Sequence, residues 1–290
     1  MRKALRWALV LLAAATVMGT VAVYHMGTLL SAPAPSEVGK PPADLPVEAV
    51  RFDSPSGSRL SGWFIRGRQG GGSVLLLHGI RANRLQMLDR ARFLHEGGYS
   101  VLLFDFQAEG ESPGEALTFG YLEAIDARAA FDFLRAKVPG ERAGVIGLSL
   151  GGASAVLAEK PLEADAMVLE AVYGDLETAV ANRMALTLGD VGRYFTPFLT
   201  AQVRPRLGFW PSALQPAKRI AEVRAPVLII AGGKDQHATM DETKAIFANA
   251  NEPKELWVIK PAGHEDFYDM VPKEYERRVL QFLGRTLRRH

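Results

Sequence analysis

The sequence predicts an α/β fold, in which a mostly parallel sheet of about eight strands carries helices on both faces. Apolar runs of strand length recur along the chain, and segments with helical periodicity separate them. A continuous apolar run is typical of a strand that is covered on both faces, and alternation with helices indicates parallel neighbours. The predicted strands are residues 47–52, 60–65, 73–77, 99–104, 143–146, 166–169, 226–231 and 255–259.

Length and composition fit one domain of this class and exclude several kinds of site. The chain has 290 residues, of which 48% are hydrophobic, so it can build a large core. Its net charge of +2 with 23% charged residues is close to balanced, and we therefore expect no nucleic-acid partner. The absence of cysteine excludes disulfides, thiolate metal sites and a cysteine nucleophile.

The N-terminus has the pattern of a membrane anchor. The basic residues Arg2, Lys3 and Arg6 precede residues 7–24, which carry no charge. A run of about 20 apolar residues can cross a bilayer as a helix, and its basic flank stays on the cytoplasmic side. We therefore expect residues 1–30 to form a single-pass anchor and the remainder of the chain to be extracytoplasmic. The alternative is a cleaved signal peptide and a secreted protein, but the prolines beside the small residues disfavour that cleavage.

The remainder divides into a linker and one folded domain. Five prolines predict that residues 31–46 form a semi-rigid, extended tether. The folded domain is expected over residues 47–290, with a short cap at about residues 174–215, where apolar and aromatic residues are mixed. The main helices predicted between and after the strands are residues 84–96, 118–138 and 272–287.

A Gly-x-Ser-x-Gly motif centred on Ser149 lies between a predicted strand and a predicted helix. A strand that turns into a helix within one residue strains the turning residue, and side chains two positions away would collide. Gly147 and Gly151 therefore carry none. The expected result is a serine hydroxyl that stands clear of the sheet beside free backbone N–H groups. The motif predicts that Ser149 is a nucleophile.

An acid and a base follow two later strands. Asp235 comes after the strand at residues 226–231, and His264 comes after the strand at residues 255–259. Because ligands sit at the carboxyl ends of parallel strands, these side chains can meet Ser149. An alcohol becomes nucleophilic when a neutral imidazole takes its proton and a carboxylate orients that imidazole. His237 is an alternative base, which its position on the same loop as Asp235 disfavours.

These motifs, in this order, resemble the α/β-hydrolase superfamily, from about residue 47 to the C-terminus. The likeness extends to bacterial single-domain esterases and peptidase-like hydrolases of the dienelactone-hydrolase and prolyl-oligopeptidase branches. It implies that Ser149 is the nucleophile, His264 the general base and then acid, and Asp235 the orienting carboxylate, with no metal or cofactor. The motifs that carry it are Leu77-His78-Gly79, Asp105 with Gly110-Glu111-Ser112, Gly147-Leu148-Ser149-Leu150-Gly151-Gly152, Gly232-Gly233-Lys234-Asp235 and Gly263-His264.

The same resemblance implies an oxyanion hole made of two backbone N–H groups. Leu150 follows the nucleophile, and Ile80 lies in the loop after the third strand. His78 precedes that loop, and we expect it to brace the loop by hydrogen bonds without taking part in catalysis.

The sequence departs from the family pattern after Asp105, where Gln107-Ala108 replaces the usual Arg-Gly. Arg81 and Arg84, near the oxyanion loop, can restore a positive charge there. We expect one of them to pair with Glu123 or Asp126 as a structural clamp. The alternative is a contact with a carboxylate or phosphate of the substrate.

The expected activity is hydrolysis of a carboxylic ester through an acyl-enzyme. An amidase or peptidase with the same three residues is the alternative within the class. A catalytically silent binding or scaffold protein at the cell envelope is the alternative from another class. The expected partners are a small-molecule ester or amide and the membrane, and no feature sets an oligomeric state. A short cap favours substrates of modest size.

Overall fold

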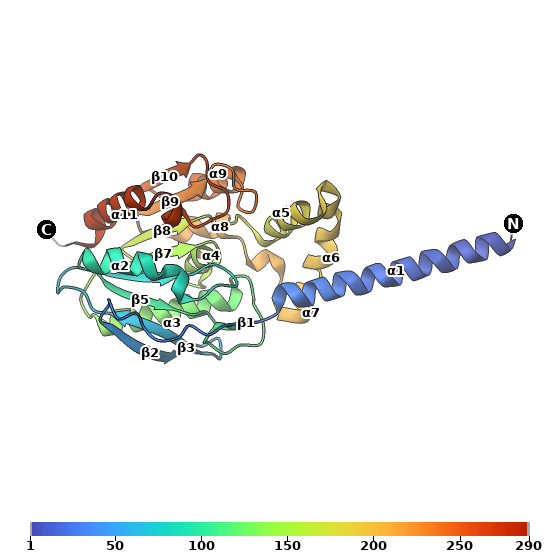
Figure 1. Ribbon diagram of the computed structural model, residues 1–290. Coiled ribbons are helices and arrows are strands. Elements are labelled where there is room, and N and C mark those ends of the chain that lie inside the picture. The colour runs from blue at the N-terminus through green and yellow to red at the C-terminus, as the bar shows by residue number, and fades with distance from the viewer. Residues whose placement is uncertain (1, 289–290) are drawn as a thin grey trace.

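The computed structural model describes residues 2–288 and is built on an eight-stranded sheet in the order β10-β9-β8-β7-β4-β5-β3-β2 (Figure 1). Strand β3 pairs antiparallel with both of its neighbours, the edge strand β2 and the strand β5, and all other pairs are parallel. The predicted fold class is confirmed. The strands are β2 (Val47–Asp53), β3 (Arg59–Ile65), β4 (Ser73–Leu77), β5 (Ser100–Phe104), β7 (Ala143–Leu148), β8 (Ala166–Glu170), β9 (Val227–Gly232) and β10 (Lys254–Ile259).

Alternation of side chains along the strands divides the core into two layers. Leu75 and Leu77 of β4 pack with the helices on one face, whereas Val74 and Leu76 pack with those on the other. All four are buried, which explains why their strand reads as a continuous apolar run. The first face carries α3 (Tyr121–Lys137), α4 (Leu150–Leu157), α8 (Pro216–Arg219) and α9 (Met240–Asn249), and the second carries α2 (Leu88–Glu96), α10 (Phe267–Met270) and α11 (Pro272–Leu287).

The cap consists of short helices between β8 and α8, and Figure 1 shows it at the end of the domain from which the N-terminal helix projects. The backbone N–H of Leu176 donates to the carbonyl of Leu214 at 3.0 Å, which ties the two ends of the cap together. Its helices are α5 (Leu176–Leu188), η2 (Asp190–Phe195), α6 (Thr196–Thr200), α7 (Val203–Leu207) and η3 (Pro211–Ala213).

The N-terminal helix α1 (Arg2–Ser31) extends away from the domain (Figure 1). Within residues 5–31 an 18-residue stretch has a mean hydropathy of 2.0, so this helix is long and apolar enough to be a candidate membrane span. Residue 1, where the predicted anchor begins, and residues 289–290, where the predicted domain ends, lie outside the described residues.

The proline-rich segment is extended, but it lies against the domain and is not the tether expected from its composition. Its strand β1 (Ala34–Pro35) pairs with β6 (Glu109–Gly110) in a small parallel sheet. Proline has no N–H to donate, and the donors are the residues on either side of Pro35. Ala34 donates to the Ala108 carbonyl at 2.7 Å, and Ser36 to the Gly110 carbonyl at 2.9 Å.

The loop after β4 is fixed by a buried histidine. His78 is fully buried, with its Nδ1 2.7 Å from the Gly79 carbonyl and its Nε2 3.1 Å from the backbone N of Phe106. These partners require a neutral ring that donates through Nδ1 and accepts through Nε2. Burial lowers the pKa of His78 from its ordinary 6.5 to about 4.

A buried arginine connects the helices of the second face to one another and to the sheet. The Arg90 guanidinium of α2 contacts Glu170 at the end of β8 at 2.8 Å and Asp266 beside α10 at 2.6 Å. The Tyr275 hydroxyl of α11 lies 3.0 Å from Arg90 Nε and also donates to Glu170. The end of β8, the segment before α10, and α11 are thereby all bound to the buried guanidinium of Arg90.

Replacing Arg90 by leucine is expected to lower the free energy of unfolding by about 3–5 kcal/mol, because the carboxylate of Glu170 then stays buried without its cation. Arg92, on the same helix, pairs with Asp44 and Asp89 at the surface, and Arg92→Leu is expected to cost less than about 1 kcal/mol. Thermal unfolding of the full chain in detergent measures both, with a drop on the order of 10 °C expected for Arg90→Leu alone. Equal midpoints for the two variants would contradict the assignment.

Acid is expected to destabilise the protein partly through His78. The unfolded chain binds a proton near pH 6.5 and the folded chain only near pH 4, so stability is lost as pH falls through this window. His78→Asn is expected to be less stable than wild type at pH 7. The difference should shrink by about 2 kcal/mol at pH 5. Urea unfolding at the two pH values measures it, and a constant difference would refute the role of this histidine.

Candidate active site

Ser149 occupies a strained turn between β7 and α4. Its φ of 50° and ψ of −109° are sparsely populated for a residue with a side chain. A Cβ at Gly147 would lie 2.5 Å from the backbone N of Gly152, and one at Gly151 would lie 2.3 Å from the Leu77 carbonyl oxygen. The backbone of α4 therefore approaches β7 and β4 so closely that only glycine fits. A side chain at either position would collide with backbone atoms.

The turn is also fixed from the neighbouring strand. The backbone N–H of Ser149 donates to the Glu170 carbonyl at 2.7 Å. Glu170 is the residue whose carboxylate binds Arg90, so the buried ion network lies directly beneath the serine.

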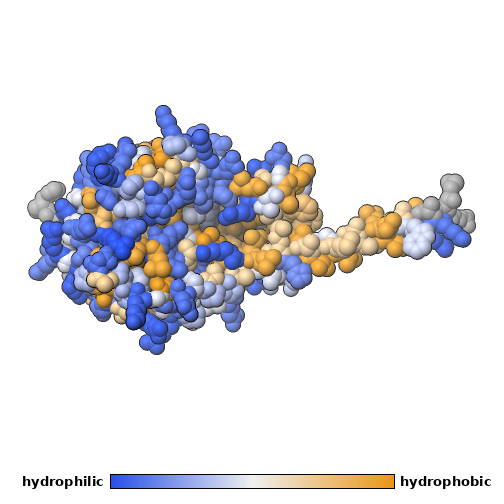
Figure 2. All heavy atoms as spheres, in the orientation of Figure 1, coloured by the Kyte–Doolittle hydropathy of each residue, from blue (hydrophilic) through white to orange (hydrophobic). Residues whose placement is uncertain are grey.

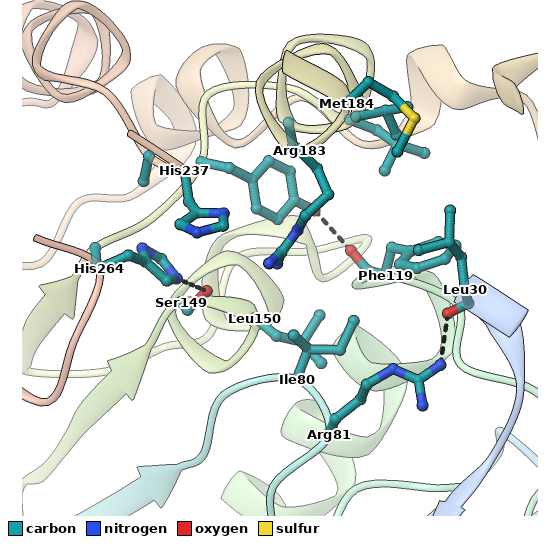
Figure 3. Close-up of a pocket in the computed structure, with 16 residues that line it drawn as sticks. Leu30, Ile80, Arg81, Phe119, Ser149, Leu150, Arg183, Met184, His237 and His264 are labelled. Atoms are coloured by element: carbon teal, nitrogen blue, oxygen red, sulfur yellow. Dashed lines mark hydrogen bonds between the residues drawn. The ribbon is translucent and has the colours of Figure 1, made fainter. Parts of the chain in front are cut away.

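The structure brings Ser149, Asp235 and His264 together at the carboxyl ends of β7, β9 and β10. Figure 3 shows the contact between Ser149 and His264. His264 Nε2 lies 3.2 Å from Ser149 Oγ, and His264 Nδ1 lies 2.8 Å from Asp235 Oδ2. An Nδ1 that donates to the carboxylate leaves Nε2 free to accept the serine proton. The arrangement can therefore deprotonate the hydroxyl of Ser149.

Asp235 is held in place by its own loop. Its carboxylate is buried, and Oδ1 accepts the backbone N–H groups of His237 and Ala238 at 2.8 and 2.9 Å. Oδ2 remains for His264, so the carboxylate can turn no further. A fixed carboxylate fixes the imidazole that it orients.

Two backbone N–H groups border the same space. Leu150 is the first residue of α4, a position whose N–H has no acceptor within its own helix. Ile80 follows the His78 loop, where Gly79 N–H donates to Gln86 Oε1 at 2.7 Å. Both residues line the cavity beside Ser149, as Figure 3 shows.

The cavity has a volume of about 300 Å³ and mostly apolar walls. Its wall includes Leu176, Val180 and Met184 of α5, Phe119 before α3, and Leu30 of α1. The cap therefore contributes to the pocket through α5. The contribution from α1 was not expected, because the sequence separates that helix from the domain by the prolines.

Arg183 is a pocket residue that sequence reasoning missed. Figure 3 shows its side chain reaching from α5 toward the start of α4 and the Ile80 loop. Burial lowers its pKa, and within residues 2–288 no carboxylate lies within ion-pair distance of it. The signal was available, because positions 176, 180 and 183 share one face of a helix and only the last is charged. A free cation here can contact an anionic group of a ligand.

His237 also faces the cavity, with its ring centroid 4.9 Å from that of His264. Burial and the nearby Arg183 and His264 lower the pKa of His237. Its role on the loop is through its backbone N–H, which binds Asp235. The structure places the ring of His264, and not that of His237, on Ser149.

The expected clamp between an arginine and Glu123 or Asp126 is wrong. Arg84 binds Asp105 at 2.8 Å and also Glu111. Gln107 accounts for the departure from the family pattern, because its amide reaches Glu123 at 3.1 Å and its backbone N–H reaches Asp126 at 2.9 Å. Both carboxylates are thus bound without a cation. Spacing alone did not reveal which carboxylate each arginine meets.

Arg81 does not pair with Glu123 or Asp126 either, and instead it binds the end of α1. Its guanidinium donates to the carbonyls of Leu29, Leu30 and Ala32, at and just beyond the last turn of α1. Figure 3 shows the contact with Leu30. A cation at the C-terminal end of a helix satisfies carbonyls that have no intrahelical partner. Arg81 therefore connects α1 to the loop that carries Ile80.

Comparisons with known proteins identify relatives of this chain. A sequence model described as the alpha/beta hydrolase family matches residues 74–278. Uncharacterized protein Rv2307c of Mycobacterium tuberculosis is 34% identical over 221 residues, which cover 75% of this chain and 72% of that protein. Uncharacterized protein YqkD of Bacillus subtilis is 22% identical over 245 residues, covering 82% and 80%. The solved structure of the Pyrococcus furiosus esterase Pf2001 is similar with a TM-score of 0.70 and 27% identity, covering 88% of this chain and 99% of that one.

The family match begins in β4 and ends within α11, so it includes the segments that carry Ser149, Asp235 and His264. The strand order, the strained serine turn and the sequence similarity agree with one another. This chain belongs to the alpha/beta hydrolase family.

Proposed function

We propose that this protein is a serine hydrolase that cleaves carboxylic esters through an acyl-enzyme. The observation that carries the proposal is the hydrogen-bonded series Ser149–His264–Asp235 at the edge of an apolar cavity. An ester is favoured over a peptide because the cavity walls are mostly apolar and because the similar Pyrococcus furiosus protein is an esterase.

The reaction follows from the positions of the groups. Ser149 Oγ attacks the ester carbonyl as its proton moves to His264 Nε2, and the imidazolium is stabilised by Asp235. The negative carbonyl oxygen is bound by the N–H groups of Leu150 and Ile80, each typically worth about 10²- to 10³-fold in rate. The C–O bond breaks, and the alcohol leaves with the proton from His264. Water then attacks the acyl-enzyme with His264 as base, which releases the acid and restores Ser149.

We also propose that α1 is an uncleaved anchor, with the N-terminus in the cytoplasm and the catalytic domain outside it. The basic residues before the apolar run support this orientation. The contacts of Arg81 with the end of α1 and the position of Leu30 in the pocket wall support retention of the helix, because cleavage near Ser31 would remove part of the site.

Ser149→Ala is expected to abolish covalent labelling by a fluorophosphonate and to lower ester kcat by at least about 10³-fold, because the attacking atom is lost. Purified wild type and variant are compared by gel fluorescence and by hydrolysis of p-nitrophenyl butyrate. Equal labelling of both, or no labelling of a folded wild type, would refute the nucleophile and favour a silent binding protein.

Substitution of the two histidines in the pocket is expected to change ester kcat by very different amounts. His264→Asn removes the base and should lower ester kcat by at least about 10³-fold. The matched variant His237→Asn keeps the backbone N–H that binds Asp235, and kcat should stay within about tenfold of wild type. The two rate constants are measured with the same ester. A larger loss for His237→Asn than for His264→Asn would reverse the assignment.

A further inference from the structure

The end of α1 is fixed against the cap. Gln202 donates to the Val23 carbonyl at 3.1 Å, and Arg206 donates to the Tyr24 carbonyl at 2.6 Å and to Thr28 Oγ1 at 2.9 Å. The Arg206 guanidinium also lies 4.0 Å from the centre of the Tyr24 ring. The cap and the candidate membrane span are therefore one unit at this point.

These contacts set the depth of the cap relative to a bilayer. The hydrocarbon core is about 30 Å thick, which corresponds to about 20 residues of helix. Counted from Arg6, the last charged residue of the basic cluster, such a span ends near Met26. The cap residues that bind Val23, Tyr24 and Thr28 therefore lie at the boundary between acyl chains and headgroups.

The cap presents large apolar side chains to solvent at the same end of the molecule. We call Val191, Tyr194, Phe198 and Trp210 the cap patch, and these side chains are 62%, 78%, 63% and 59% exposed. Figure 2 shows apolar residues on the cap beside the point where α1 leaves the domain. Arg204 lies 4.3 Å from the centre of the Trp210 ring. Exposed aromatics with neighbouring arginines are typical of a membrane interface.

Two cavities with a shared wall lie between Ser149 and α1. A second cavity of about 40 Å³ lies between α1 and the cap, lined by Gly27 of the helix and Leu199 and Val203 of the cap. It shares part of its wall with the Ser149 cavity, and the shared residues are Leu30, Phe119, Leu176 and Val180. An acyl chain that extends from an ester at Ser149 along these shared walls points toward the C-terminal turns of α1.

We propose that the cap patch lies in the lipid leaflet and that the substrate is a lipid ester, whose acyl chain reaches Ser149 from the bilayer between α1 and the cap. The proposal rests on the esterase function proposed above. Hydrolysis breaks the bond between the acyl carbon and the alcohol oxygen, water supplies the hydroxyl of the fatty acid, and the alcohol leaves with a proton.

The depth of the cap patch in the bilayer can be measured by an experiment that does not depend on catalysis. The chain has no cysteine, so one cysteine at Phe198 (Phe198→Cys) and, as the matched control, one at the exposed Lys273 of α11 can each carry an environment-sensitive fluorophore. The full chain is placed in nanodiscs with or without doxyl-labelled lipid. Doxyl lipid is expected to quench the label at 198 at least about twofold more than the label at 273. Equal quenching would overturn the membrane placement, whether or not the protein is an esterase.

Substrate class is tested with the cap patch variant Tyr194→Ser/Phe198→Ser/Trp210→Ser. Its kcat/KM for a monoacylglycerol presented in nanodiscs is expected to fall at least about tenfold, because three interfacial side chains are lost. Turnover of soluble p-nitrophenyl acetate, which needs no bilayer, should stay within about twofold of wild type.

The outcomes that contradict the two proposals differ. Wild type that hydrolyses the acetate but not the monoacylglycerol would overturn the lipid substrate, and so would an equal loss of both activities in the variant. A folded wild type that hydrolyses neither ester would overturn the esterase proposal itself, and the quenching result would then still decide the placement of the cap.

Discussion

The close approach of α4 to β7 and β4 is the constraint on which the rest of the structure depends. It requires glycine at 147 and 151, it holds Ser149 at a positive φ, and it places the first N–H of α4 beside the hydroxyl. Every other functional group is arranged about this fixed point. Because the turn is made of backbone packed on backbone, it admits little adjustment, and the partners must be brought to it by their own loops.

Buried charges hold those loops at the required distance. Arg90 reaches Glu170 beneath the serine and Asp266 two residues after His264, while Arg84 reaches Asp105 behind the Ile80 loop. Each pair is costly to break because one charge would remain buried without a partner. The site is thus supported by contacts from α2 and from the loop after β4, neither of which carries Ser149, Asp235 or His264. The ion pairs of Arg84 and Arg90 therefore make the surroundings of Ser149 rigid.

The N-terminal helix, which is a candidate membrane span, also forms part of the pocket. Leu30 forms part of the wall, Arg81 and Arg206 bind the backbone of its last turns, and β1 continues the contact along the domain. Any displacement of α1 relative to the domain therefore changes the wall of the cavity directly. The cap and α1 therefore contact each other and together form walls of the cavity that contains Ser149.

The sequence by itself determined the eight strands, the chain order of Ser149, Asp235 and His264, and the long apolar helix at the N-terminus. These follow from local patterns: apolar runs, the glycines around Ser149, and polar residues directly after strands. It did not determine that Arg84 would meet Asp105 and Glu111, that Arg183 would lack a carboxylate in the cavity, or that the proline segment would pair with β6. Those partners are far apart in the chain, so only the tertiary structure decided which charges and backbone groups came within reach of one another.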